Sequence, residues 1–202
     1  MKLLVTGGAG FIGSNFIRSH LASSDDEITV LDALTYAGSR DTLSDFIDDT
    51  RVSFIEGDIC DRETVKSAME GHQLVVHFAA ESHVDRSIDG SERFILTNCV
   101  GTNLLCDIAT QMEVERFVHI STDETYGSRK HGSFTENDKL EPSSPYAASK
   151  AASDLIALSH HTTNDLPVII TRSSNNYGPF QFPEKLIPLF VTNLLEGLSV
   201  PL

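Results

Sequence analysis

Short apolar segments alternate along this chain with longer segments whose apolar residues recur at helical spacing. The short segments are rich in β-branched and aliphatic residues, which is typical of buried strands. They are residues 2–6, 28–31, 52–56, 74–78, 116–120 and 167–172. Because strands alternate with helices, we predict an α/β fold built on a doubly wound parallel sheet, a Rossmann fold with helices on both faces.

The helices are expected where apolar residues repeat every three or four positions. One follows Gly13, with Phe16, Ile17 and Leu21 on its apolar face. A long one covers residues 91–111, and its apolar face is Ile95, Val100, Leu104, Leu105 and Ile108. Two more cover residues 146–161 and 183–195, the second interrupted or shifted at Pro188. The polar loop at residues 126–144 is expected to cover part of a site.

The loop after the first strand carries Gly7, Gly8, Gly10 and Gly13. It fits both Gly-x-x-Gly-x-x-Gly and Gly-x-Gly-x-x-Gly. Such a loop lets the backbone approach a pyrophosphate at the N-terminus of the following helix. Asp32 ends the second strand, nineteen residues after Gly13. An acidic residue there binds the adenosine ribose and repels a 2′-phosphate, so we predict NAD rather than NADP.

Two later strand ends add candidates around the same cofactor. Asp58 and Ile59 follow the third strand, where the adenine is expected. The small residues Ala79 and Ala80 follow the fourth and leave room for the cofactor beside the backbone. His83 could contact cofactor or substrate, and a structural loop histidine is an equally good interpretation.

A tyrosine and a lysine four residues apart form the candidate catalytic pair. Tyr146 and Lys150 lie on one helix face, so the ammonium can stabilise the phenolate and lower the pKa of the tyrosine. The hydroxyl and carboxyl groups of residues 121–124 follow the fifth strand, at the edge where open α/β sheets bind ligands. Together they predict an acid/base site. The alternatives are a half-buried aromatic on an amphipathic helix and a solvated turn.

The charge balance limits the partners. Fifteen basic and 29 acidic residues give a formal charge of −14, which argues against nucleic acid and anionic membranes. An acidic surface also suits a high-salt cytoplasm. Cys60, Cys99 and Cys106 lack metal-ligand spacing and are expected to be reduced, and no metal is predicted. With no apolar run of membrane-spanning length, we place the chain in the cytoplasm.

These motifs together resemble the extended short-chain dehydrogenase/reductase family, and within it the dTDP-glucose 4,6-dehydratases. The glycine loop and the Tyr146/Lys150 pair are similar to the superfamily as a whole. Asp123, Glu124 and residues 79–87 are similar to the dehydratases, and Thr125 departs from their usual Val. Members are typically longer, so the chain is expected to be an amino-terminal portion, with a NAD-binding domain at residues 1–180 and the start of a substrate-binding region at 181–202.

The resemblance implies a role for each matching position. The catalytic residues are Thr122, Asp123, Glu124, Tyr146 and Lys150. The cofactor-binding residues are Gly7, Gly10, Phe11, Ile12, Gly13, Asp32, Thr35, Asp58, Ile59, Ala79, Ala80, Ser82, Thr97, Tyr146, Lys150 and Asn176. The substrate-binding residues are Ser82, His83, Thr122, Asn175, Lys185 and Leu186.

The implied reaction converts dTDP-glucose to the 4-keto-6-deoxy sugar with loss of water and with NAD regenerated. Tyr146 takes the proton of the carbon 4 hydroxyl, Glu124 removes the carbon 5 proton, and Asp123 donates to the departing carbon 6 hydroxyl. Repulsion between adjacent carboxyls lets one act as an acid while its neighbour acts as a base.

Two rival functions stay open from the sequence. One is a 4-epimerase or decarboxylase on the same scaffold, which needs no paired acid and base after the Thr. The other is a catalytically silent NAD-binding or assembly domain. The helices at residues 91–111 and 146–161 resemble those that pair across a two-fold axis in this family, so a homodimer is expected.

Overall fold

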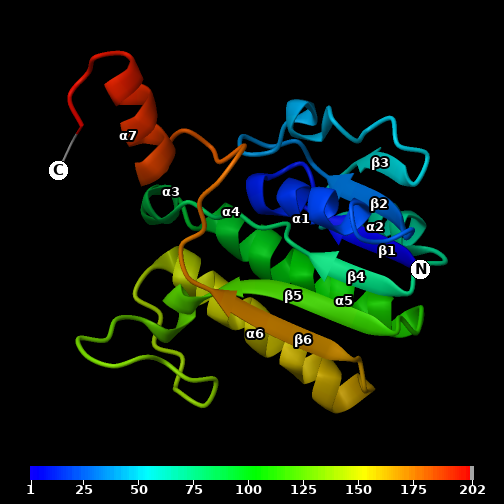
Figure 1. The fold of residues 1–202 in the computed structure, drawn as a ribbon. Coiled ribbons are helices and arrows are strands. Elements are labelled where there is room, and N and C mark those ends of the chain that lie inside the picture. Colours follow the sequence, from blue (N-terminus) through cyan, green and yellow to red (C-terminus); the bar gives the residue numbers. More distant parts are fainter. Residues whose placement is uncertain (201–202) are drawn as a thin grey trace.

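The computed structural model describes residues 1–200 and has a six-stranded parallel sheet at its centre (Figure 1). Its strands are β1 (Lys2–Thr6), β2 (Glu27–Asp32), β3 (Val52–Glu56), β4 (Leu74–His77), β5 (Arg116–Thr122) and β6 (Val168–Ser173). Their order is β3-β2-β1-β4-β5-β6, and every pairing is parallel. The order reverses between β1 and β4, the switch point at which such sheets bind ligands. The predicted fold class is confirmed.

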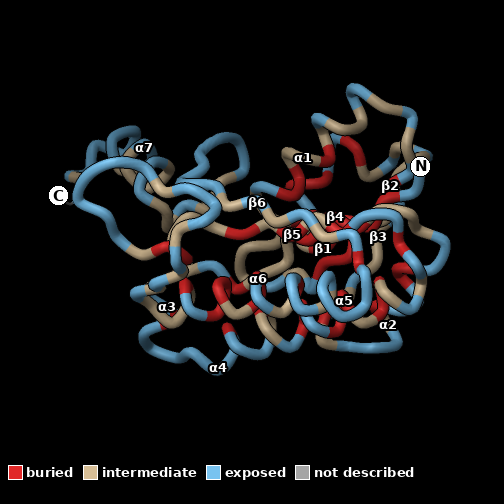
Figure 2. Tube along the Cα trace, turned by 90° about the horizontal axis from the view of Figure 1, so that it is seen from below, coloured by how far each residue is buried: buried red, intermediate tan, exposed pale blue. Residues whose placement is uncertain are grey.

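Helices cover both faces of this sheet (Figure 2). On one face lie α1 (Phe11–Leu21) and the short 3-10 helix η1 (Arg40–Leu43). On the other lie α2 (Arg62–Met69), α5 (Thr102–Gln111) and α6 (Pro145–Asn164). The remaining helices are α3 (Val84–Asp89), α4 (Glu92–Phe94), the π-helix η2 (Ile95–Gly101), the 3-10 helix η3 (Asp123–Tyr126) and α7 (Leu186–Leu195).

Two apolar cores hold these layers together. Alternate residues of a strand face opposite sides of a sheet, so neighbouring residues of β1 enter different cores. Leu4 packs with α2, α5 and α6, in a core that includes Phe117 and Leu105. Leu3 and Val5 pack with Ile17 of α1 on the other side. This burial fixes the register of the strands and therefore the positions of the loops at their carboxyl ends.

The long helix predicted at residues 91–111 is present but is not a regular α-helix. Its middle turn is the π-helix η2, which shifts the phase of the side chains that precede it. Leu104, Leu105 and Ile108 are buried as predicted. Ile95 and Val100 are exposed, at 47% and 49%, so that part of the predicted apolar face is wrong.

Other boundaries differ by a few residues. Helix α6 extends to Asn164 rather than residue 161. Helix α7 begins at Leu186, so Pro188 lies in its first turn and does not interrupt it. Strand β5 extends to Thr122, which places Asp123 and Glu124 in the turn η3 immediately after it.

Candidate functional site

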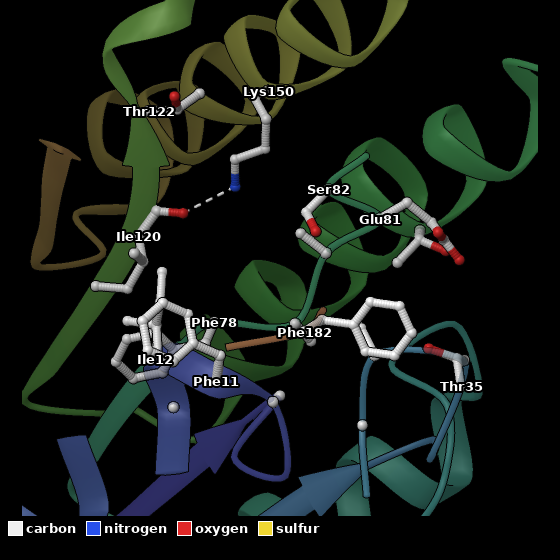
Figure 3. A pocket seen from close by; sticks show the side chains of 18 of the residues that line it. Phe11, Ile12, Thr35, Phe78, Glu81, Ser82, Ile120, Thr122, Lys150 and Phe182 are labelled. Carbon is white, nitrogen blue, oxygen red and sulfur yellow. Dashed lines mark hydrogen bonds between the residues drawn. The ribbon is translucent and has the colours of Figure 1, made fainter. Parts of the chain in front are cut away.

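A pocket opens at the carboxyl edge of the sheet, where the loops after all six strands meet (Figure 3). Its volume is about 320 Å³, within the range of small-molecule sites. Figure 3 shows Lys150 entering it from α6 and Phe182 lying near Thr35 at the other end. The pocket therefore joins the glycine loop to the Tyr146/Lys150 helix.

The glycine loop has no space for side chains at two positions. Gly7 has φ of +70°, and a Cβ atom there would lie 2.5 Å from the backbone N of Ala79. A Cβ on Gly13 would lie 2.4 Å from the carbonyl oxygen of Gly7. Helix α1 begins directly after this loop, and its first residues line the pocket. The loop therefore presents backbone and a helix N-terminus to a ligand, which is the arrangement that binds a diphosphate.

Asp32 lies at the end of β2 and is 8% exposed. Its Oδ2 accepts a hydrogen bond from the backbone N–H of Ala9 at 2.9 Å, and its Oδ1 accepts one from that of Leu34 at 2.9 Å. Burial raises the pKa of this carboxyl, against the two hydrogen bonds. A carboxylate oxygen can accept more than one hydrogen bond, so Asp32 can still bind ribose hydroxyls.

Tyr146 lies in the first turn of α6. This helix begins with Ser144, whose hydroxyl accepts from the N–H of Ala147 at 3.1 Å, followed by Pro145, a favourable first residue. The backbone N–H of Tyr146 donates to the hydroxyl of Ser87 at 3.1 Å. The first turn is therefore fixed to α3 as well as capped.

The pKa values of the pair differ from the sequence prediction. Burial raises the pKa of Tyr146, Glu124 adds to the rise, and a hydrogen bond with Thr122 opposes it. The pKa of Lys150 is lowered to about 8 by burial. Its ammonium donates to the carbonyl oxygen of Ile120 at 2.8 Å (Figure 3). The predicted lowering of the tyrosine pKa by Lys150 is wrong for this structure, because desolvation of the phenolate outweighs the neighbouring charge.

Thr122, Asp123 and Glu124 form the turn that follows β5. The hydroxyl of Thr122 accepts from the backbone N–H of Glu124 at 3.2 Å and lies 3.5 Å from Asp123 Oδ1. Burial raises the pKa of Glu124, the charge of Asp123 raises it further, and Lys185 opposes the rise. A carboxyl with a raised pKa is a stronger base, which suits the role that the sequence assigns to Glu124.

Most of the predicted site residues line this one pocket. Those that do are Gly7, Gly10, Phe11, Ile12, Gly13, Asp32, Thr35, Asp58, Ile59, Ala79, Ala80, Ser82, Thr97, Thr122, Glu124, Tyr146, Lys150, Asn175, Asn176 and Lys185. Asp123 lies beside it in η3. His83 instead caps α3, with its Nε2 3.6 Å from Glu184, and Leu186 is 66% exposed at the start of α7.

The sequence prediction omitted Phe182 and Glu184, which also line the pocket. The ring of Phe182 contacts that of Tyr36 edge-on, with centroids 5.9 Å apart. Glu184 accepts from Arg86 at 3.0 Å, and the Arg86 guanidinium lies 4.0 Å from the Tyr36 ring centroid. These contacts connect three segments remote in sequence. The sequence signal for both was that residues 181–189 are similar to the dehydratases, although only Lys185 and Leu186 of this segment were assigned to the site.

Known proteins are similar to this chain in sequence and in fold. The model of the GDP-mannose 4,6 dehydratase family matches residues 4–202. The chain belongs to this family. A family relative from Streptomyces antibioticus, a dTDP-glucose 4,6-dehydratase, is 56% identical over the whole chain and 61% of its own length. The Low-salt glycan biosynthesis protein Agl12 of Haloferax volcanii is 54% identical over the whole chain and 65% of its own length.

A solved structure has the same fold. It is the dTDP-glucose 4,6-dehydratase DesIV of Streptomyces venezuelae, with NAD and TYD bound. The TM-score is 0.98 and the identity 56%, over all of this chain and 64% of DesIV. The chain thus spans less than two thirds of the length of these relatives.

Residues 1–200 contain neither a membrane-spanning helix nor a cluster of metal ligands. No helix in this part of the chain is both long and apolar enough to span a membrane. Within the same residues, no three His, Cys, Asp or Glu side chains gather as metal ligands would.

Proposed function

We propose that this chain carries the NAD-binding and catalytic part of a dTDP-glucose 4,6-dehydratase. The observation that supports this most directly is the single pocket that contains the glycine loop and Asp32 at one end and Thr122, Glu124, Tyr146 and Lys150 at the other. The identity of over half of all residues to dTDP-glucose 4,6-dehydratases adds to it.

The pocket fits NAD in two respects. The glycine loop has no room for side chains and would hold the diphosphate with backbone N–H groups. Asp32 would accept hydrogen bonds from the adenosine ribose and repel a phosphate in place of its 2′-hydroxyl. Bound NAD would supply the redox chemistry, as a hydride acceptor for carbon 4 of the sugar and a hydride donor for carbon 6.

The chain's own residues would move the protons. Tyr146 would take the proton of the carbon 4 hydroxyl, and Thr122 would hydrogen-bond the same oxygen. The raised pKa of Tyr146 means that this step needs a positive charge that favours the phenolate, which the oxidised nicotinamide of bound NAD would supply. The resulting ketone acidifies carbon 5, from which Glu124 would remove the proton. Asp123 would protonate the departing carbon 6 hydroxyl.

Product analysis tests this function. The purified 202-residue chain is incubated with NAD and dTDP-glucose, and the products are measured by mass. Loss of one water supports the proposal. An isomer of unchanged mass would instead indicate a 4-epimerase. NAD binding without turnover would show that the reaction needs parts of the longer relatives that this chain does not contain.

We also propose that the chain forms a homodimer through η2 and α6. Five large apolar side chains lie exposed on these two helices, at 47%, 48%, 49%, 59% and 40%: Ile95, Leu96, Val100, Leu155 and Leu158. An apolar patch of this kind on a soluble chain is typical of a protein interface. Light scattering should give twice the chain mass for the wild type and the monomer mass for Leu155→Glu. A wild-type monomer would contradict the proposal.

A further inference from the structure

A fully buried carboxylate lies directly behind the candidate catalytic pair. Asp154 is one helical turn after Lys150 on α6 and is 0% exposed. Its Oδ2 accepts a hydrogen bond from Nε of Arg172 on β6 at 2.8 Å. Its Oδ1 lies 3.3 Å from Nε2 of His119 on β5. A buried charge is costly unless it is paired, so its partners hold Asp154 in one position.

Arg172 continues this network to the turn that carries the acid/base carboxyls. Its Nη1 donates to the hydroxyl of Tyr126 at 2.6 Å, and its guanidinium lies 4.9 Å from the Tyr126 ring centroid. Tyr126 is buried and is the last residue of η3, two positions after Glu124. Asp154, Arg172 and Tyr126 thus form a continuous polar connection from α6 to η3.

We propose that Asp154 is a positioning residue for the reaction: through Arg172 and Tyr126 it holds the Tyr146/Lys150 helix and the Asp123/Glu124 turn in their relative positions, and its charge stabilises the ammonium of Lys150. The inference rests on the proposed function, because it assumes that both groups act on one substrate. The first proton leaves the substrate at carbon 4 to Tyr146 on α6, and the second leaves at carbon 5 to Glu124 in η3, so displacement of η3 relative to α6 should slow the second step.

Asp154 also lies four residues after Lys150 on the same helix, and its negative charge favours the ammonium of Lys150. The titratable groups facing Lys150 from other elements are Cys99 of η2, His77 of β4 and His119 of β5. Burial raises the pKa of the Cys99 thiol and lowers the pKa values of both histidines, so all three are neutral near pH 7. Arg172 faces Asp154 from β6. Removal of the Asp154 charge should therefore destabilise the ammonium of Lys150.

The first test measures the pKa of Lys150 without any turnover. The chain is labelled with ¹³C-lysine, the Cε resonance of Lys150 is assigned with Lys150→Arg, and its titration is followed by NMR. Asp154→Asn should lower the pKa of Lys150 by roughly one unit. The matched control is Asp107→Asn, which removes a carboxylate paired with Arg62 at 2.6 Å on the surface of α5 and should leave the pKa unchanged. An unchanged value in folded Asp154→Asn overturns the proposal.

The second test avoids a buried charge change that could prevent folding. Tyr126→Phe removes only the hydroxyl that accepts from Arg172. In single-turnover experiments it should slow water loss between about ten- and a hundredfold, while oxidation at carbon 4 keeps the wild-type rate. Arg172→Lys should have the same effect on the two rates, because a lysine ammonium cannot reproduce the guanidinium's two separate donors to Asp154 and Tyr126.

Equal slowing of both half-reactions, or no slowing of either, overturns the proposal. A wild-type chain without turnover contradicts the proposed function alone, and the NMR titration then still decides the role of Asp154.

Discussion

The close approach of Gly7 to the fourth strand end allows a quantitative prediction about the glycine loop. In Gly7→Ala the new Cβ would lie 2.5, 2.7 and 2.8 Å from backbone atoms of residues 78 and 79, distances that real Cβ atoms do not show. The loop after β4 must therefore move away from β1. This loop carries Ala79, Ala80 and Ser82, which line the pocket, so the same movement alters the candidate cofactor site.

Two separate costs add up at this position. An alanine at φ of +70° costs roughly 1–2 kcal/mol, because Cβ approaches the carbonyl oxygen. Steric overlap with fixed backbone adds roughly 1–3 kcal/mol. Gly71 provides a matched control: its φ is +74°, but nothing lies within 4 Å of its added Cβ. Gly71→Ala therefore has the cost of the positive φ but no steric overlap.

Thermal unfolding with and without NAD measures both effects. For a chain of this size about 1 kcal/mol corresponds to roughly 2–4 °C in Tm. Gly71→Ala should lower Tm by about 2–8 °C and leave NAD affinity unchanged. Gly7→Ala should lower Tm by about 4–20 °C and weaken NAD binding at least about tenfold. Equal effects of the two substitutions would refute the argument, because the close contact with the β4 loop would then have no energetic consequence.

Three further predictions concern charge. Glu124→Gln should leave oxidation at carbon 4 intact but slow water loss by about a hundredfold or more, measured by product mass; unchanged dehydration would exclude Glu124 as the base. Burial lowers the pKa of His119 to about 4. As the pH drops from 6.5 towards 4, the imidazole is therefore protonated in the unfolded chain but not in the folded one, so the free energy of unfolding should fall. His119→Gln should flatten that part of the pH dependence of unfolding, whereas an identical slope would exclude His119 as its source. With a net charge of −14 and exposed carboxylates such as Asp41 and Asp48, Tm should rise in molar KCl, and a constant Tm would contradict adaptation to high salt.

The fold was predictable because its signals are local and repeated. Each of the six strands is a short apolar run, and their alternation with helices indicates parallel pairing with helices on both faces. The π-helix η2 was not predictable in this way, because an extra residue in one turn leaves the composition of the segment unchanged. It moved Ile95 and Val100 from the predicted buried face to the surface.

The candidate site was predictable only where a motif fixes a residue to a strand end. Asp32 and Tyr146 lie where the glycine loop and the strand ends imply. Phe182 and Glu184 were missed because their contacts with Tyr36 and Arg86 join segments that are far apart in the chain. The direction of the Tyr146 pKa was also wrong, since burial of a phenol depends on surrounding residues rather than on its spacing from Lys150.

The raised pKa of Tyr146 and the lowered pKa of Lys150 have one physical cause, because burial disfavours the charged form of each. A positive charge placed beside them would lower the tyrosine pKa, whereas bulk water would remove the desolvation that raises it. A site that keeps Tyr146 protonated until a positively charged cofactor binds would avoid proton transfer in the absence of cofactor. Asp154 and Glu124 then have opposite effects, since Asp154 favours the charged form of Lys150 and Glu124 opposes ionisation of Tyr146.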